Sequence, residues 1–260
     1  MHDGIERYEA DGFLVTGPVF PPQDIETIIR SVDALCERAA RDSAMAEHCV
    51  FERDQPKEKR GGAEVREDDM SVFILGDLPR FCPELLPVIL NAQLAGLVSE
   101  LLGASGIVTH FANLTAKTAG IGSGISWHRD FPNKFISPVT PEMVRTMICL
   151  DGMSPENGAT TFLRGSHKTP GIQASSIAEN DADIAAAVCA PGGIVAIHPL
   201  VLHGGPPNTS SRPRRNIVIQ WGRKGVPLAT DNSESITGKT VEDLRAEFHG
   251  SGAPTMRDGF

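Results

Sequence analysis

The sequence predicts a mainly β fold, a sandwich or a barrel, with helices at its flanks. From about residue 106 to residue 222, short β-prone runs are broken by Gly, Pro, Asn and Ser. Many short strands separated by frequent turn signals are typical of all-β sandwiches and barrels. The clearest runs are GIVTHFANLTA, TMICLDGM, ATTFLRGS, GGIVAIHP and RNIVIQWG.

Amphipathic stretches outside this region predict the helices. Residues 21–40 begin with two prolines and Asp24, which favour a helix start, and apolar residues then recur at helical spacing. That apolar stripe consists of Ile25, Ile28, Ile29, Val32, Leu35 and Cys36. A second helix is predicted over residues 84–102, with Gly103 as its stop signal. Near the end of the chain, Thr240 can cap a short third helix.

A chain of 260 residues can form one domain with one substantial core. We therefore expect a single domain over residues 1–260, with a helical part up to about residue 105. A β core over about 106–222 and a C-terminal extension over 223–260 complete it. Residues 52–69 are dense in charges of both signs and predict a solvated loop, although a lid that closes over a substrate would have the same composition.

The net charge of −9 and the pI of about 5.4 bear on the partners of the chain. Nucleic acid is not expected, because phosphate binding relies on clustered Lys and Arg. The same balance favours a neutral or cationic small molecule over a polyanion as substrate. It leaves the oligomeric state undetermined.

Cysteine usage and hydropathy predict the compartment. The five Cys residues are scattered without a C-x-x-C pair, which indicates reduced thiols rather than a disulfide framework or a zinc site. The polar, acidic start MHDGIERYEADGF does not resemble a signal peptide. No apolar run approaches the ~20 residues that span a bilayer, so no membrane contact is expected. We expect a cytoplasmic protein.

The stretch SWHRDFPN, residues 126–133, can be interpreted in two ways. It resembles a kinase catalytic loop, but that loop has Asn five residues after Asp, whereas Asn133 is three residues after Asp130. No D-F-G or A-P-E follows, and the nearby GIGSG is not G-x-G-x-x-G. The kinase interpretation is therefore set aside in favour of a His-x-Asp metal motif.

On a strand, residues i and i+2 face the same side, so His128 and Asp130 can both be directed at one point. An imidazole and a carboxylate suit a divalent metal such as Fe(II), and a second His would complete a 2-His-1-carboxylate face with three open positions. His-x-Asp alone occurs often by chance. His203 follows an apolar run and precedes a Gly-Pro loop, and Arg214, eleven residues later, could bind a dicarboxylic co-substrate through its planar fork.

Further motifs in this order carry a family resemblance. They are YEADGFLVTGPVF at 8–20, WHRDF at 127–131, ENG at 156–158 leading to RGSHK at 164–168, PGG at 191–193, and HGGPPNTS at 203–210 with Arg214. Together they resemble the phytanoyl-CoA dioxygenase-like (PhyH-type) branch of the Fe(II)/2-oxoglutarate oxygenases. Residues after about 225 fall outside the resemblance. The separation from Asp130 to His203 is shorter than the family pattern, which predicts a trimmed loop and a more open pocket.

The resemblance implies a double-stranded β-helix, which is a cupin-like jelly roll, and it implies residue roles. His128, Asp130 and His203 would bind Fe(II). Arg214 would pair with the distal carboxylate of the co-substrate 2-oxoglutarate. Other candidate 2-oxoglutarate residues are Lys117, Thr115 and Ser210, and candidate substrate residues beside the metal motif are Trp127, Phe131, Asn133 and Lys134.

The implied activity is that of a 2-oxoglutarate-dependent dioxygenase. Such an enzyme consumes O2 and 2-oxoglutarate and oxidises an unactivated C–H bond by hydroxylation, ring closure or desaturation. Asp130 argues against a halogenase, because family halogenases have Gly or Ala at that position. We expect a small polar metabolite as substrate, either a sugar, an aminoglycoside-like compound or an amino acid derivative, in a tailoring step of natural-product biosynthesis.

Two alternatives remain open at the level of the sequence. One is a metal-dependent jelly-roll enzyme that does not use 2-oxoglutarate, against which Arg214 argues. The other is a non-catalytic binding module of the same fold, against which the complete set of His128, Asp130 and His203 argues.

Overall fold

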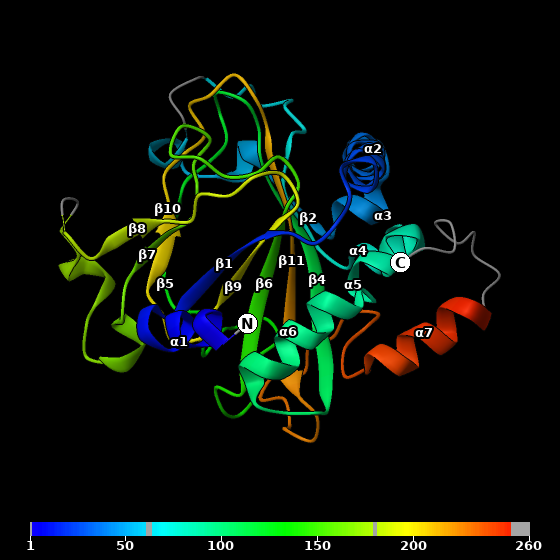
Figure 1. Cartoon of the computed structure of the whole chain (residues 1–260). Coiled ribbons are helices and arrows are strands. Elements are labelled where there is room, and N and C mark those ends of the chain that lie inside the picture. Colours follow the sequence, from blue (N-terminus) through cyan, green and yellow to red (C-terminus); the bar gives the residue numbers. More distant parts are fainter. Residues whose placement is uncertain (1, 61–63, 179–180, 251–260) are drawn as a thin grey trace.

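The computed structural model describes residues 2–60, 64–178 and 181–250, and two antiparallel sheets face each other within it (Figure 1). The large sheet contains β1 (Phe13–Pro18), β2 (Cys49–Phe51), β3 (Val72–Leu75), β4 (Ile107–Lys117), β6 (Met143–Cys149), β9 (Gly193–Ile197) and β11 (Arg214–Arg223). The small sheet contains β5 (Ile125–His128), β7 (Thr161–Leu163), β8 (Ile184–Ala186) and β10 (His203–Gly205). Their spatial orders are β1-β9-β6-β11-β4-β3-β2 and β5-β10-β7-β8. The prediction of a mainly β jelly roll with flanking helices is confirmed.

The helices lie around the large sheet. The α-helices are α1 (His2–Asp11), α2 (Pro22–Ala39), α3 (Ser43–Ala46), α4 (Leu78–Phe81), α5 (Leu86–Ile89), α6 (Ala92–Leu102) and α7 (Val241–Gly250). Short 3-10 turns occupy Glu52–Asp54, Lys57–Lys59, Pro83–Leu85, Ser166–Lys168 and Ala174–Ser176. Among the described residues no single helix has the length and apolarity to cross a bilayer, although the bent pair Pro83–Ile89 and Ala92–Leu102 would pass that test jointly.

The helix predicted over residues 84–102 is divided in the structure. A 3-10 turn and α5 come first, and α6 begins anew at Ala92. Asn91 explains the new start, because its Oδ1 accepts a hydrogen bond from the backbone N–H of Leu94 at 3.0 Å and caps the helix. Gly103 ends α6 with φ +55°, as predicted.

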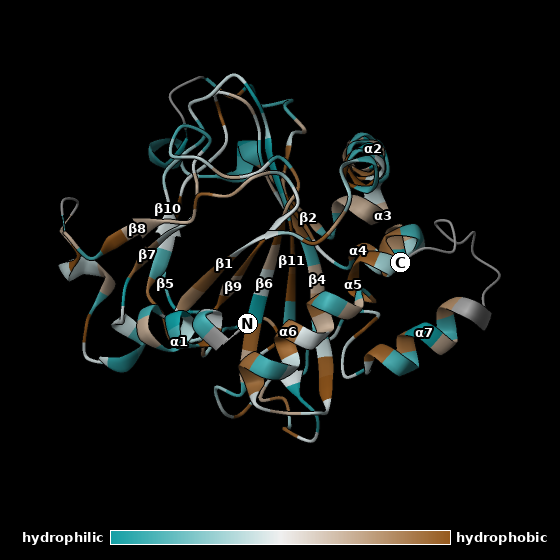
Figure 2. Cartoon of the chain, in the orientation of Figure 1, coloured by the Kyte–Doolittle hydropathy of each residue, from teal (hydrophilic) through white to brown (hydrophobic). Residues whose placement is uncertain are grey.

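Alternate residues of the large sheet face two different environments. Val144 and Ile148 of β6 join the larger apolar cluster under the helices, in which α6 packs against β6 and β11 (Figure 2). Met147 and Cys149 belong to a smaller cluster on the opposite face, with Phe162 of the small sheet. Because side chains alternate along a strand, the same strands build both the core beneath the helices and the wall of the space between the sheets.

The expected division near residue 105 does not separate helices from strands. β1, β2 and β3 all precede it and join the large sheet, with β1 paired to β9 through Phe13 and Ile197. The C-terminal extension also packs on this sheet, since the backbone of Thr109 exchanges hydrogen bonds with Lys239 and Gly238. Residues 251–260 lie outside the described residues.

The charged segment 52–69 begins with a buried side chain, whereas its other described residues are exposed or half-buried, in line with the expected solvated loop. Glu52 is 0% exposed, and its carboxylate accepts hydrogen bonds from the Ser123 backbone N–H at 3.1 Å and hydroxyl at 2.6 Å. The Lys59 carbonyl accepts a further bond from Gly124 at 2.6 Å. The start of this segment therefore fixes the glycine-rich loop that leads into β5.

Replacing Glu52 with Ala should lower the free energy of unfolding by about 1–3 kcal/mol, because two buried donors of Ser123 lose their acceptor. Urea denaturation measures this change. Glu58→Ala, an exposed carboxylate in the same segment, is the matched control and should change stability by less than about 0.5 kcal/mol. Equal effects of the two substitutions would show that Glu52 does not anchor the loop.

Glu234 ties the C-terminal extension to β4. Its Oε2 accepts a hydrogen bond from the Ala112 backbone N–H at 3.1 Å. Burial, reinforced by the negative charge of Asp77, raises the pKa of Glu234 from 4.5 to about 8. The folded state therefore favours the neutral acid, so this contribution to stability is complete below pH 4.5 and is lost as the pH rises through about 8.

Between pH 5 and pH 9, wild-type protein should lose up to about 4 kcal/mol more stability than Glu234→Gln, which cannot ionise. Urea denaturation across this range provides the test. Glu242→Gln, at an exposed position of α7, should leave the wild-type pH dependence in place. The same pH dependence in wild type and Glu234→Gln would contradict the assignment.

Candidate metal centre

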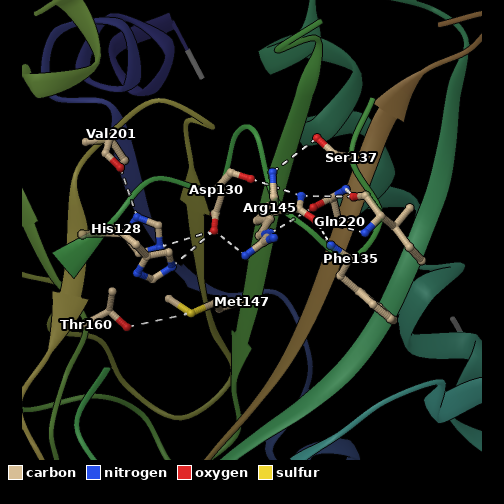
Figure 3. A network of polar contacts seen from close by, with 12 residues as sticks. His128, Asp130, Phe135, Ser137, Arg145, Met147, Thr160, Val201 and Gln220 are labelled. Atoms are coloured by element: carbon tan, nitrogen blue, oxygen red, sulfur yellow. Dashed lines mark hydrogen bonds and ion pairs between the residues drawn. The ribbon is translucent and has the colours of Figure 1, made fainter. Parts of the chain in front are cut away.

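Three ligand-type side chains meet between the sheets, and they are the predicted His128, Asp130 and His203. Figure 3 shows His128 and Asp130 directed toward each other. Oδ1 of Asp130 lies 3.5 Å from Nε2 of His128 and 3.7 Å from Nε2 of His203. The candidate ligand atoms all lie within 4.8 Å of one another. Side chains from two adjacent strands and one loop thus converge on a single point.

Strand pairing brings the two histidines together, because His203 of β10 is the register partner of His128 of β5. Gly204 permits this approach, since a Cβ atom there would lie 2.7 Å from the carbonyl oxygen of Ile125. The His-x-Asp spacing predicts that Asp130 lies on the same strand as His128. In the structure, Asp130 instead lies in the loop that follows β5. The Pro199 carbonyl holds this loop by accepting the backbone N–H of Asp130 at 3.0 Å.

Backbone carbonyls orient both imidazole rings. Nδ1 of His128 lies 2.9 Å from the Ser126 carbonyl, and Nδ1 of His203 lies 3.1 Å from the Val201 carbonyl. A carbonyl oxygen only accepts hydrogen bonds, so each Nδ1 carries the proton and each Nε2 presents a lone pair toward Asp130. Metal-binding histidines are commonly held in this way.

The ionisation of these groups also fits a cation. Burial raises the pKa of Asp130, but the Arg145 guanidinium and both imidazoles outweigh it and hold that pKa well below its usual range. Burial lowers the pKa of His203 to about 4, so its ring is neutral at pH 7. Oδ2 of Asp130 is buried without a hydrogen-bond partner among the described residues. An ionised carboxylate, an unpaired buried oxygen and two imidazole lone pairs suit a divalent metal such as Fe(II).

The three ligands share a cavity of about 230 Å³ with the predicted Arg214. Arg214 is 2% exposed, and its Nη1 donates a hydrogen bond to the Gly158 carbonyl at 2.8 Å. Within the described part of the chain its Nε is buried without a hydrogen-bond partner, as is Oδ1 of Asn216, two residues along β11. The cavity therefore offers unpaired polar atoms of β11 on one side and the metal ligands on the other.

The other predicted 2-oxoglutarate residues lie in different places. Thr115 lines the cavity. Lys117 is the register partner of Arg214 but is fully buried, and its ammonium donates to the carbonyls of Gly158 and Pro206 rather than lining the cavity. Ser210 hydrogen-bonds to Asn208 and lines a separate cavity of about 980 Å³ beside α2. The structure thus brings Arg214 and Thr115 to the metal ligands, but not the side chains of Lys117 and Ser210.

The predicted substrate residues do not line this cavity. Trp127, which precedes His128 on β5, is half-buried and is not among the residues that line the cavity. Asn133 shapes its own loop, because its Oδ1 accepts the N–H groups of Phe135 and Ile136. Phe131 is half-buried and Lys134 is exposed. Their contact with substrate stays a prediction.

Sequence reasoning missed Arg145, which lines the cavity and donates to Oδ1 of Asp130. A detectable signal was its position as a lone charge in the apolar run MVRTMIC. Asn216 and Thr160 were also missed as lining residues. Small polar residues in a strand carry little signal until the facing sheet is known.

The chain belongs to the phytanoyl-CoA dioxygenase (PhyH) family, whose family model matches residues 8–216. It is 27% identical to an ectoine dioxygenase of Bordetella parapertussis over 169 residues, which cover 64% of this chain and 49% of that protein. It is 24% identical to a phytanoyl-CoA dioxygenase domain-containing protein 1 homolog of Caenorhabditis elegans, over 84% of this chain and 90% of that protein. The chain spans about half the length of the ectoine dioxygenases that it matches.

Solved structures share the fold. EctD from S. alaskensis with bound Fe superposes with a TM-score of 0.72 at 20% identity, covering 88% of this chain and 79% of that one. EvdO2 from Micromonospora carbonacea complexed with 2-oxoglutarate superposes with a TM-score of 0.63 at 19% identity, covering 92% of this chain and 96% of that one. SnoK, a non-heme alpha ketoglutarate dependent carbocyclase from nogalamycin biosynthesis, superposes with a TM-score of 0.68 at 15% identity. The match covers 86% of this chain and 84% of that one.

Replacing His203 with Ala should weaken Fe(II) binding by more than the ~10- to 100-fold that loss of an outer hydrogen-bond partner costs, because a direct ligand is removed. Anaerobic equilibrium dialysis of metal-free protein against Fe(II) measures the affinity. His167→Ala is the matched control, because His167 lies outside the ligand cluster and bonds to the Glu9 carbonyl. Wild-type affinity in His203→Ala would place the metal elsewhere.

Proposed function

We propose that this chain is an Fe(II)/2-oxoglutarate-dependent oxygenase that oxidises a C–H bond of a small polar metabolite. The observation that carries the proposal is one small cavity that holds His128, Asp130 and His203 together with the buried Arg214. Membership of the PhyH family and the Fe and 2-oxoglutarate named for its structural neighbours support it.

In this proposal His128, Asp130 and His203 hold Fe(II), and Arg214 binds the distal carboxylate of 2-oxoglutarate. When bound, iron and 2-oxoglutarate supply the O2-dependent oxidation of the substrate, with release of succinate and CO2. The apolar side chains of Met147, Ile197 and Val218 line the same cavity and exclude water from it. A dry wall strengthens the interaction between Arg214 and a carboxylate.

Lys117 has a different role in this scheme. Its Nζ and Nη1 of Arg214 both donate to the Gly158 carbonyl, at 3.1 and 2.8 Å. Lys117 therefore positions the backbone that orients Arg214, and does not itself bind 2-oxoglutarate. Burial lowers the pKa of Lys117 to about 6, which is consistent with a site closed to solvent.

The size of the cavity bears on the substrate. Its volume of about 230 Å³ is below the ~300–1,000 Å³ of most ligand sites, so 2-oxoglutarate occupies much of it. The substrate then approaches from the open side of His128, whose side chain is 39% exposed. A sugar, an aminoglycoside-like compound or an amino acid derivative remains our proposal, with hydroxylation, ring closure or desaturation as the outcome. A tailoring step in natural-product biosynthesis is part of this proposal, and the structural neighbour SnoK is named for nogalamycin biosynthesis.

The cellular compartment and the binding partner are part of the same proposal. Five free cysteines support a cytoplasmic protein. A small molecule, rather than nucleic acid or a membrane, is the proposed partner.

Anaerobic titration of metal-free protein with Fe(II) and then 2-oxoglutarate tests the proposal. A weak visible charge-transfer band should appear only when both are present. In Arg214→Ala the band should require about 10- to 100-fold more 2-oxoglutarate, because a charged hydrogen-bond partner is lost. Arg215→Ala is the matched control, because Arg215 faces the other side of β11 and pairs with Asp151 and Asp33.

The outcomes separate the two enzyme classes. Iron that binds without any band would contradict the use of 2-oxoglutarate and favour a metal-dependent jelly roll of another kind. Equal 2-oxoglutarate affinity in wild type and Arg214→Ala would contradict the role of Arg214 alone.

A further inference from the structure

A second cationic side chain faces the metal ligands from the large sheet. Arg145 of β6 lies opposite Gln220 of β11, six residues along that strand from Arg214. Both arginines line the same cavity. The 2-oxoglutarate role proposed for Arg214 leaves Arg145 without an assigned function.

The Arg145 guanidinium is held in a fixed plane. Its Nη1 donates to Oδ1 of Asp130, and its Nε donates to Oε1 of Gln220 at 3.1 Å (Figure 3). Its Cζ atom lies 5.1 Å from the centroid of the Phe111 ring. The Gln220 amide is fixed in turn, because it donates to the Ile136 carbonyl at 2.7 Å.

This arrangement leaves part of the guanidinium available. The Arg145 side chain is 18% exposed, and its Nη2 has no hydrogen-bond partner among the described residues. The free Nη2 of this fixed guanidinium can donate a charge-assisted hydrogen bond to a carboxylate oxygen. Arg145 is therefore preorganised toward the cavity.

The charges of the cavity wall favour an anionic substrate. Among its lining residues, Asp130 is the anion, and Arg145 and Arg214 are the cations. Fe(II) and the dianion 2-oxoglutarate cancel each other, so the loaded cavity keeps one positive charge. Bound Fe(II) would share the Asp130 carboxylate with Arg145, so the Arg145 charge would be only partly compensated. An uncompensated charge in such a site is costly, and an anion on the substrate removes that cost.

Nearby titratable groups do not supply the missing charge. His110, which lies 2.9 Å from the Gln220 amide, is neutral at pH 7, because burial lowers its pKa to about 4. Glu52 and Lys117 both lie outside the cavity lining, and burial shifts the pKa of each toward its neutral form. The compensating anion must therefore come from a ligand.

We propose that Arg145 binds a carboxylate of the primary substrate, which makes that substrate a small carboxylic acid such as an amino acid derivative. This inference rests on the proposed function, and it replaces the neutral or cationic substrate that the acidic composition favours. Arg145 would then fix the substrate beside the metal, while Gln220 acts as its positioning residue.

The test uses protein loaded anaerobically with Fe(II) and saturating 2-oxoglutarate. The probes are matched acids and amides, N-acetylglycine with N-acetylglycinamide and cyclohexanecarboxylate with cyclohexanecarboxamide. The acids should shift the visible band and raise the melting temperature, and the amides at equal concentration should do neither. In Arg145→Gln, compared at Fe(II) and 2-oxoglutarate concentrations that saturate its own band, the apparent affinity for the acids should fall about 10- to 100-fold.

Two further variants keep the test decisive. Arg223→Gln, a surface arginine at the end of β11, should behave as wild type. Gln220→Leu leaves Asp130 untouched but frees the guanidinium, so it should bind iron normally and show a weaker preference for acids. A preference of that kind would support the role of Arg145 even if Arg145→Gln binds iron poorly.

Several results would overturn the inference. They are equal responses to acids and amides in wild type, an unchanged acid response in Arg145→Gln, or acids that abolish the band by displacing 2-oxoglutarate. Iron loss in Arg145→Gln with an unaltered acid preference in Gln220→Leu would show that Arg145 serves Asp130 alone. Absence of the band before any probe is added would instead reject the proposed function, and this inference with it.

Discussion

The ionised carboxylate of Asp130, buried between two sheets, is the constraint on which the rest of the site depends. A buried charge is tolerated only when it is paired, and here Arg145, His128 and His203 all face it. The Pro199 carbonyl fixes the loop that carries Asp130. The metal centre therefore forms only when several elements are in place, namely β5, β6, β10 and the loop between β9 and β10. It is a property of the assembled sandwich.

Strand alternation distributes the chemistry along the large sheet. The inward positions of β11 carry Arg214, Asn216 and Gln220, while its outward positions carry Ile217, Ile219 and Trp221 in the core under the helices. A polar wall can therefore stand in a stable sheet, because the apolar burial that stabilises the sheet lies on its other face. The cavity can therefore contain both Arg145 and Arg214 without a charged side chain in the larger apolar core.

Backbone carbonyls do much of the positioning. They orient both imidazole rings, receive the Lys117 ammonium and accept a hydrogen bond from Arg214. A carbonyl is fixed by the chain around it and cannot change its protonation state, so it sets a tautomer or a guanidinium plane without adding a titratable group. Glu52 extends this pattern outward, because it anchors the loop that leads into β5.

Local signals in the sequence predicted much of the fold and the site, because strand runs, amphipathic spacing and ordered motifs do not depend on distant contacts. They predicted the mainly β class, the helix over residues 21–40, and the residues His128, Asp130, His203 and Arg214. Other features could not be predicted, since each depends on a partner far along the chain. They are the strands before residue 105, the burial of Glu52 and the position of Arg145 in the cavity. Lys117 and Ser210 show the converse, because a place in a motif does not determine where a side chain points. The sequence by itself determined which groups could bind a metal and a dicarboxylate. Only the tertiary structure decided which side chains share the cavity and which charges oppose one another there, because burial and electrostatic pairing arise from contacts between distant segments.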